Sequence, residues 1–159
     1  MVAALWMNVA KIDLLPHFRF VAAPFLWGIA TAAGSVSITL ISITLGKRIP
    51  FFAELKKMSD QYLAPLLALL GAGDIIFLSL LSGFAEEVFF RGLMQAQCGI
   101  FASSIAFGFF HDPTLKQRSY IIFACVAGLL LGFVYEKTGN LWTCITAHSL
   151  HNLVTMLAL

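Results

Sequence analysis

The feature that most constrains this chain is a long stretch, Phe20 to Gly46, that contains no charged residue. As one α-helix its 27 residues would extend about 40 Å, more than the roughly 30 Å hydrocarbon core of a bilayer. A soluble fold could not also bury the rest of the chain, because 60% of the 159 residues are hydrophobic and only 11% are charged. We therefore expect an integral membrane protein whose first span is this stretch.

Charge and cysteine content argue against a nucleic-acid-binding protein and against a protein held together by disulfides. The formal net charge is only +2 and the basic residues are scattered, so we expect no nucleic-acid partner. Cys98, Cys125 and Cys144 lie far apart without a Cys-x-x-Cys motif, and we interpret them as buried free thiols. The first ten residues lack an early basic region and a clear cleavage site, so we expect this segment to be retained at the membrane interface.

After the first span the chain becomes polar before it turns apolar again. Lys47 to Asp60 holds the densest set of basic residues, and the positive-inside rule places this predicted loop on the cytoplasmic side. Residues 61–73 are apolar but contain Pro65, Gly71 and Gly73, which favours a short or broken helix.

The second half is predicted to contain several apolar helices. A long helix is expected from Asp74 to about Gln97, and residues 99–110 are short for a span, hence re-entrant or strongly tilted. Tyr120 to Tyr135 is uncharged, Glu136 to Asn140 reads as a polar turn, and Leu141 to Leu159 as the last helix. The fold class is therefore all-α: a polytopic transmembrane helical bundle of about four to five membrane helices, including one short or re-entrant segment.

Two glutamates and an arginine interrupt the helix that begins near Asp74. A charged side chain in the middle of a transmembrane helix costs roughly 2.5 to 3.5 kcal/mol on insertion scales, so its presence there indicates a functional role. Glu87 and Arg91 are four residues apart and can pair on one face, whereas Glu86 faces about 100° away. We interpret Glu87 and Arg91 as a supporting pair and Glu86 as directed at a site. The alternative is a solvated helix end at the membrane surface.

Three more polar residues interrupt later apolar segments. His111 ends such a segment just before Asp112, which alone is ordinary for an interfacial residue. His148 and Asn152 are four residues apart in the last helix, and two neighbouring donors on one face suit an oxyanion. Polar contact between packed membrane helices is the alternative for this pair.

Taken together, these groups on three separate helices would converge in a bundle. The set consists of Glu86, His111, His148 and Asn152. It is consistent with hydrolysis in which Glu86 and His111 activate water while His148 and Asn152 stabilise the oxyanion, without a cofactor. A catalytic zinc held by one glutamate and two histidines ranks lower because no His-Glu-x-x-His occurs. A proton or ion pathway built on the same residues is the alternative outside hydrolysis.

Three motifs, Glu-Glu-x-x-x-Arg, Phe-x-x-x-His and His-x-x-x-Asn, occur in this order. Their residues are Glu86, Glu87 and Arg91, then Phe107 and His111, then His148 and Asn152. In this order and spacing the chain resembles the type II CAAX prenyl endopeptidases and their bacterial relatives, the CAAX protease and bacteriocin-processing family of intramembrane glutamic proteases. The stretch Tyr135 to Trp142 is similar to the family's link into its last helix, and the resemblance covers roughly residues 74–156.

The resemblance implies a membrane endopeptidase with catalytic Glu86, His111, His148 and Asn152, supported by Glu87 and Arg91, and without a metal. Residues 74–159 would form the catalytic helical domain, and residues 1–73 an N-terminal membrane region with the first span and the basic loop. Expected partners are a peptide or protein substrate, prenylated or not, and the lipid bilayer; the expected location is the bacterial inner (plasma) membrane, multi-pass. The alternative is a non-catalytic membrane immunity or partner-binding protein of the same fold.

Overall fold

The computed structural model describes residues 12–46, 48–112 and 114–159, and every regular element among them is a helix, which confirms the all-α class. Within these ranges, two helices are long and apolar enough to cross a bilayer: α2 (Ala22–Leu45) and α7 (Arg118–Thr138). A third span is available if the bent pair Pro50–Leu67 and Ala72–His111 counts as one; its 118° bend is that of a broken span or a re-entrant loop. The expectations for the first ten residues and for Lys47 fall outside the described residues.

The first predicted span is α2, which faces mostly outward. Only 17% of its most apolar window is buried within the protein, as expected for a helix surrounded by lipid. Its hydroxyl side chains donate to backbone carbonyls three or four residues earlier, which satisfies them without water. These residues are Thr31, Ser35, Ser37, Thr39, Ser42 and Thr44.

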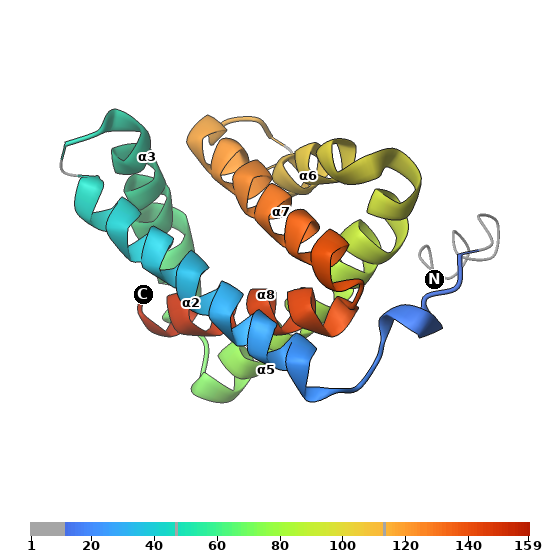
Figure 1. The fold of residues 1–159 in the computed structure, drawn as a ribbon. Coiled ribbons are helices and arrows are strands. Elements are labelled where there is room, and N and C mark those ends of the chain that lie inside the picture. Colours follow the sequence, from blue (N-terminus) through green and yellow to red (C-terminus); the bar gives the residue numbers. More distant parts are fainter. Residues whose placement is uncertain (1–11, 47, 113) are drawn as a thin grey trace.

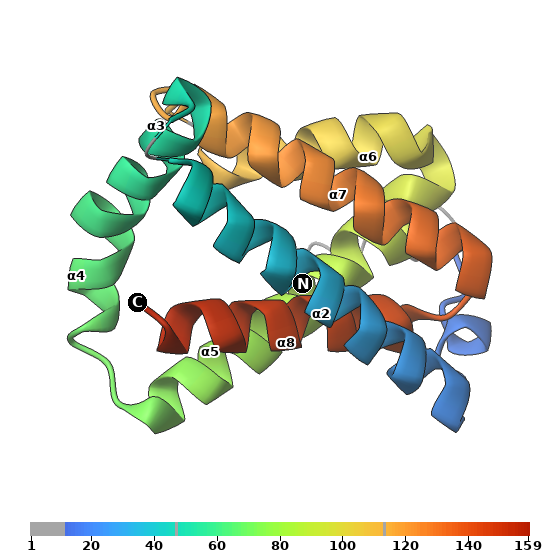
Figure 2. The ribbon, with the colours of Figure 1, turned by 60° about the vertical axis from the view of Figure 1, so that its left-hand side comes forward.

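The helices form two packed groups that meet at a π-helical segment, η3 (Val88–Gln95). In one group α8 (Leu141–Leu157) packs against both α2 and α5 (Ala72–Glu87), and in the other α6 (Ala96–His111) packs along α7 (Figures 1 and 2). Segment η3 joins α5 to α6 and contacts both groups. Its polar residues are thereby placed in the interior of the bundle.

The segment from Lys47 to Asp60, predicted as a loop, is largely helical where it is described. Helix α3 (Pro50–Met58) begins at a proline, which the first helical turn tolerates, and a second π-helical segment, η2 (Ser59–Leu63), and α4 (Ala64–Leu67) continue it. An ion pair of 2.6 Å between Lys56 Nζ and Asp60 Oδ2 spans four residues on its exposed face. The high charge that suggested a loop is therefore the solvated face of a helix.

The turn before α8 is shorter than predicted, because α7 continues through Thr138. Gly139 ends α7 in the left-handed conformation, with φ 58° and ψ 23°, and its N–H donates to the Tyr135 carbonyl at 2.8 Å. Asn140 then caps α8 by accepting the Trp142 N–H at 3.0 Å, and its amide donates to the Arg19 carbonyl at 2.8 Å. This two-residue connection fixes the direction of α8 and of the histidines on it.

The three cysteines are free, but only one is fully buried. Cys144 lies in the core, where its S–H donates to the Leu131 carbonyl at 3.2 Å, and Cys125 is half-buried. The prediction of a buried thiol is wrong for Cys98, which is exposed on the first turn of α6, just before the chain bends at Gly99.

Close contact between α2 and α8 depends on Gly28. A Cβ there would lie 2.7 Å from the Thr143 carbonyl oxygen, whereas a Cβ at Gly34 in the same helix would meet nothing within 4 Å. We expect Gly28→Ala to lower the free energy of unfolding by about 1 to 3 kcal/mol, because the helices must separate. Gly34→Ala should leave it unchanged or raise it by up to about 1 kcal/mol. Unfolding of both variants in one detergent measures this, and equal stabilities would contradict the packing.

Candidate active site

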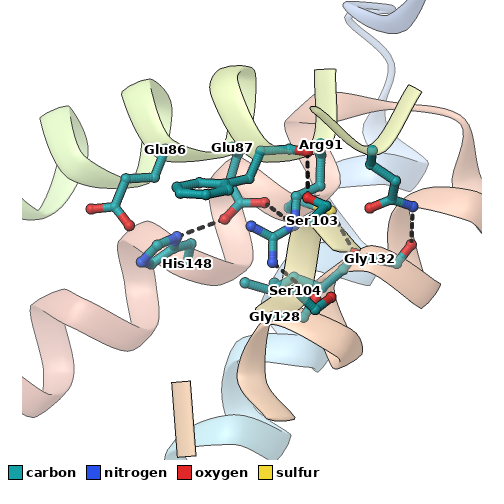
Figure 3. A network of polar contacts seen from close by, with 12 residues as sticks. Glu86, Glu87, Arg91, Ser103, Ser104, Gly128, Gly132 and His148 are labelled. Carbon is teal, nitrogen blue, oxygen red and sulfur yellow. Dashed lines mark hydrogen bonds and ion pairs between the residues drawn. The ribbon is translucent and has the colours of Figure 1, made fainter. Parts of the chain in front are cut away.

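Three helical segments carry the predicted site residues. Glu86 and Glu87 end α5, His111 ends α6, and His148 and Asn152 lie on α8. Inside α6, residue 99 is a glycine with φ 79°, a conformation that other residues rarely adopt, and the chain turns back there. This reversal returns the end of α6 to the end of α5. Figure 3 shows the two carboxylates projecting from α5 toward the α8 histidine.

Glu86 and His111 face each other at a separation that one water molecule can bridge from the side. Glu86 Oε2 lies 3.8 Å from His111 Nε2, too far for a direct hydrogen bond. That oxygen is buried and has no hydrogen-bond partner among the described residues, although the two side chains are 31% and 21% exposed. His111 Nδ1 lies 2.7 Å from the Phe107 carbonyl, which can only accept, so Nδ1 is a donor and Nε2 of the neutral ring is left to accept. The gap therefore presents two acceptors to a water molecule.

Glu87 is buried between two partners. Its Oε1 lies 2.7 Å from His148 Nδ1 and its Oε2 lies 3.2 Å from Arg91 Nε. The Glu87 and Arg91 side chains are 0% and 1% exposed, so each charge depends on the other for compensation. The structure has the Glu87 to Arg91 pair that the spacing predicts. The bond to His148 connects this pair to α8 and was not anticipated from the sequence.

Arg91 also joins η3 to α7. Its Nη2 donates to the Gly128 carbonyl at 2.9 Å, and its guanidinium lies 4.6 Å from the centre of the Phe107 ring. Gln95, one turn later, donates in the same way to the Gly132 carbonyl at 3.1 Å. Sequence reasoning missed the two glycines, although their spacing of four is the small-residue pattern of close membrane-helix contacts.

The helix widens into π geometry directly after Glu87. Segments of this kind are often found at functional sites, where they reposition side chains. The Ser103 hydroxyl on α6 donates to the Phe90 carbonyl at 2.7 Å and so satisfies a backbone group within the widened segment. This bond also ties the reversed α6 to η3.

Asn152 and His151 face different helices. Asn152 Nδ2 donates at 3.0 Å to the hydroxyl of Ser82, which lies one turn before Glu86 on α5. His148 and Asn152 thus both face α5, as their spacing on one face predicts. His151 Nδ1 instead lies 3.0 Å from the Ser35 hydroxyl on α2, so this histidine serves the α2 to α8 contact.

Asp112, directly after His111, organises the start of the next loop. Its carboxylate accepts the Thr114 hydroxyl at 2.5 Å and the Gln117 N–H at 2.6 Å, and these hydrogen bonds lower the pKa of Asp112 below its ordinary 3.8. A carboxylate whose pKa is lowered by folding stabilises the fold at any pH above its ordinary pKa. This stabilisation is lost as the pH falls through the lowered pKa of the folded protein.

We expect Asp112→Asn to have a lower Tm than the wild type at neutral pH, and we expect this difference in Tm to shrink in acid. A constant difference in Tm would contradict this.

A metal centre would require several donors around one point. The part of the chain that the structure describes contains no group of three His, Cys, Asp or Glu side chains that could hold a metal ion. A zinc site built from Glu86, His111 and His148 would therefore need these side chains to rearrange around the ion. Hydrolysis without a cofactor stays a prediction.

These features define a helical membrane protein with an internal carboxylate and histidine site. A family model described as Type II CAAX prenyl endopeptidase Rce1-like matches residues 68–154, more than half of the chain, and the chain belongs to this family. The match includes every residue of the three motifs and confirms the resemblance drawn from them.

A relative among curated proteins is similar over part of its length. "Uncharacterized protein YpbD" of Bacillus subtilis (strain 168) is 43% identical over 74 residues, a match that covers 46% of this chain and 39% of that protein. The match thus extends over less than half of each protein. No solved structure matches the chain.

Proposed function

We propose that this chain is an intramembrane endopeptidase that hydrolyses a peptide bond with water activated by Glu86 and His111. The observation that carries the proposal is the 3.8 Å gap between Glu86 Oε2 and His111 Nε2, two acceptors in a partly buried setting. A water beside these two atoms, within hydrogen-bond distance of both, would donate one hydrogen to each, which directs an oxygen lone pair outward for attack on a carbonyl carbon. Family membership supports protease chemistry at the level of the family.

The remaining steps follow from the same side chains. Glu86 takes a proton from the attacking water and returns it to the amine that leaves when the peptide C–N bond breaks. The oxyanion of the tetrahedral intermediate would accept from Asn152 and from Nε2–H of His148. His148 donates at Nε2 as well as to Glu87 only when both ring nitrogens carry a proton. Asn152 has a second amide N–H besides the one bound to Ser82, so it can donate without losing that contact.

Glu87 and Arg91 would support these steps without touching substrate. Glu87 accepts from His148 Nδ1 at 2.7 Å and so orients the ring with Nε2 toward the site. Arg91 compensates the buried carboxylate. The proposed substrate is a peptide or protein segment at the membrane, prenylated or not. Residues 74–159 would form the catalytic domain that cuts it. The proposed location of this chain is the bacterial inner membrane, as a multi-pass protein.

The test is peptide cleavage by the purified wild type with and without a metal chelator. We expect cleavage to persist in chelator, because the proposed water activation uses only protein groups. Loss of cleavage in chelator and its return with zinc would replace this mechanism by a metal-dependent one. Absence of cleavage across a broad peptide library, with the protein folded, would favour the immunity or partner-binding alternative.

A further inference from the structure

A polar hollow of about 280 Å³ opens between α3 and the start of α7. Its lining contains none of the proposed catalytic and supporting residues of the candidate active site. Its lining includes three basic residues, Lys57, Lys116 and Arg118, and a single carboxylate, Glu54. The hollow therefore carries a net positive lining in a chain whose total charge is small.

The basic side chains of the hollow form no ion pair with a carboxylate of the described residues. Within the described ranges, the ion pairs of lysine and arginine join Lys56 to Asp60 and Arg91 to Glu87, and none involves the three basic residues of the hollow. Glu54 itself accepts a hydrogen bond from the Ser119 hydroxyl. Exposed cations that surround a hollow without a protein counter-ion favour an anion in solution or in the membrane.

The hollow lies at the ends of two membrane spans. Helix α2 ends at Leu45 shortly before α3, α7 begins at Arg118, and α3 contacts both helices. Figure 2 shows α3 beside these two ends. Ends of apolar spans lie at the depth of the lipid headgroups. Tyr62, also in the lining, is 57% exposed and of a type enriched at this interface.

A second hollow of about 300 Å³ adjoins the first. The two share Lys57 and Gln61, and the second extends to Gly46 at the end of α2. Together they offer room for more than a single phosphate group and lead toward the lipid-facing end of α2. The lining of the second hollow also includes Lys56 and Asp60, which pair with each other, so this hollow suits the uncharged glycerol of a headgroup, a part that free phosphate lacks.

We propose that this hollow binds the phosphate of an anionic phospholipid headgroup, contacted by Lys57, Lys116 and Arg118. The Arg118 guanidinium can bind two phosphate oxygens at once, while the lysines supply point charges. Basic pockets between membrane helices are suited to such headgroups. The proposal does not depend on peptide hydrolysis.

The test is retention of lipid by the purified full chain, counted by native mass spectrometry. Wild type, Lys57→Gln/Lys116→Gln and Arg19→Gln/Lys137→Gln are each titrated with phosphatidylglycerol, phosphatidylcholine or inorganic phosphate. The control pair removes the same charge at the opposite ends of α2 and α7. Each basic residue contributes about fivefold to affinity near an anionic headgroup, so the first double variant should bind phosphatidylglycerol about 30-fold more weakly.

The wild type should retain phosphatidylglycerol in preference to phosphatidylcholine, and the control variant should keep this preference. Phosphatidylglycerol should also protect Lys57 and Lys116 of the wild type from reductive methylation, a readout that needs no variant. Equal retention of both lipids, equal loss in both double variants, or methylation unaffected by lipid would overturn the proposal. Equal protection by inorganic phosphate at the same concentration would show that the hollow binds free phosphate and would contradict the proposal that the bound phosphate belongs to a lipid.

Discussion

Glu86→Gln is expected to lower kcat/KM for peptide cleavage by about 10²- to 10⁴-fold while the protein keeps its fold. The amide has the size of the carboxylate but cannot accept a proton from the attacking water. Glu86 is 31% exposed and its nearest ionisable partner is 3.8 Å away, so the variant loses no close ion pair. The measurement is steady-state cleavage of one peptide by both proteins, with unfolding in detergent recorded alongside.

Glu87→Gln is the matched control, because it removes the adjacent carboxylate of the same helix. This variant leaves the buried Arg91 without its counter-charge, so we expect a large loss of stability together with reduced activity. Glu86→Gln should instead separate activity from stability. Similar losses of stability in the two variants would contradict the division of roles between the two glutamates.

Arg91→Met is expected to lower the free energy of unfolding by about 3 to 5 kcal/mol. The substitution removes the guanidinium counter-charge of the fully buried Glu87 carboxylate, and it removes the 2.9 Å hydrogen bond to the Gly128 carbonyl. Denaturant or thermal unfolding in detergent measures the loss. Arg48→Met is the control, because Arg48 is exposed and its removal should change stability by less than about 0.5 kcal/mol.

The double variant Glu87→Gln/Arg91→Met separates charge compensation from packing. Removing both charges of a buried pair costs much less than removing one, so the double variant should be more stable than Arg91→Met alone. If Arg91→Met were no less stable than Arg48→Met, or if the double variant lost the sum of the single effects, the buried pair would not hold this region together.

Much of the helical structure could be predicted from local patterns in the sequence. The uncharged run from Phe20 to Gly46 predicts α2, and the spacing of Glu87 and Arg91 predicts their ion pair, because both depend on residues near each other in one helix. The helix at α3 was missed since its charges resemble those of a loop, although its Lys56 to Asp60 spacing is helical.

The contacts between helices could not be predicted from the sequence. The bonds from His148 to Glu87 and from Asn152 to Ser82 depend on where α8 crosses α5, and no pattern in either helix specifies the crossing point. Position 99, where the φ of 79° reverses the chain, marks the start of the short segment predicted there. The sequence alone did not indicate that the reversal brings His111 back to Glu86.

The measurement that tests the central claim most directly is product identification by mass spectrometry. Wild type and Glu86→Gln are incubated in parallel, in chelator, with one library of prenylated and unprenylated peptides. We predict defined cleavage products from the wild type that are absent from the Glu86→Gln reaction. The same products at the same rate from both proteins would contradict water activation by Glu86 and with it the proposed function.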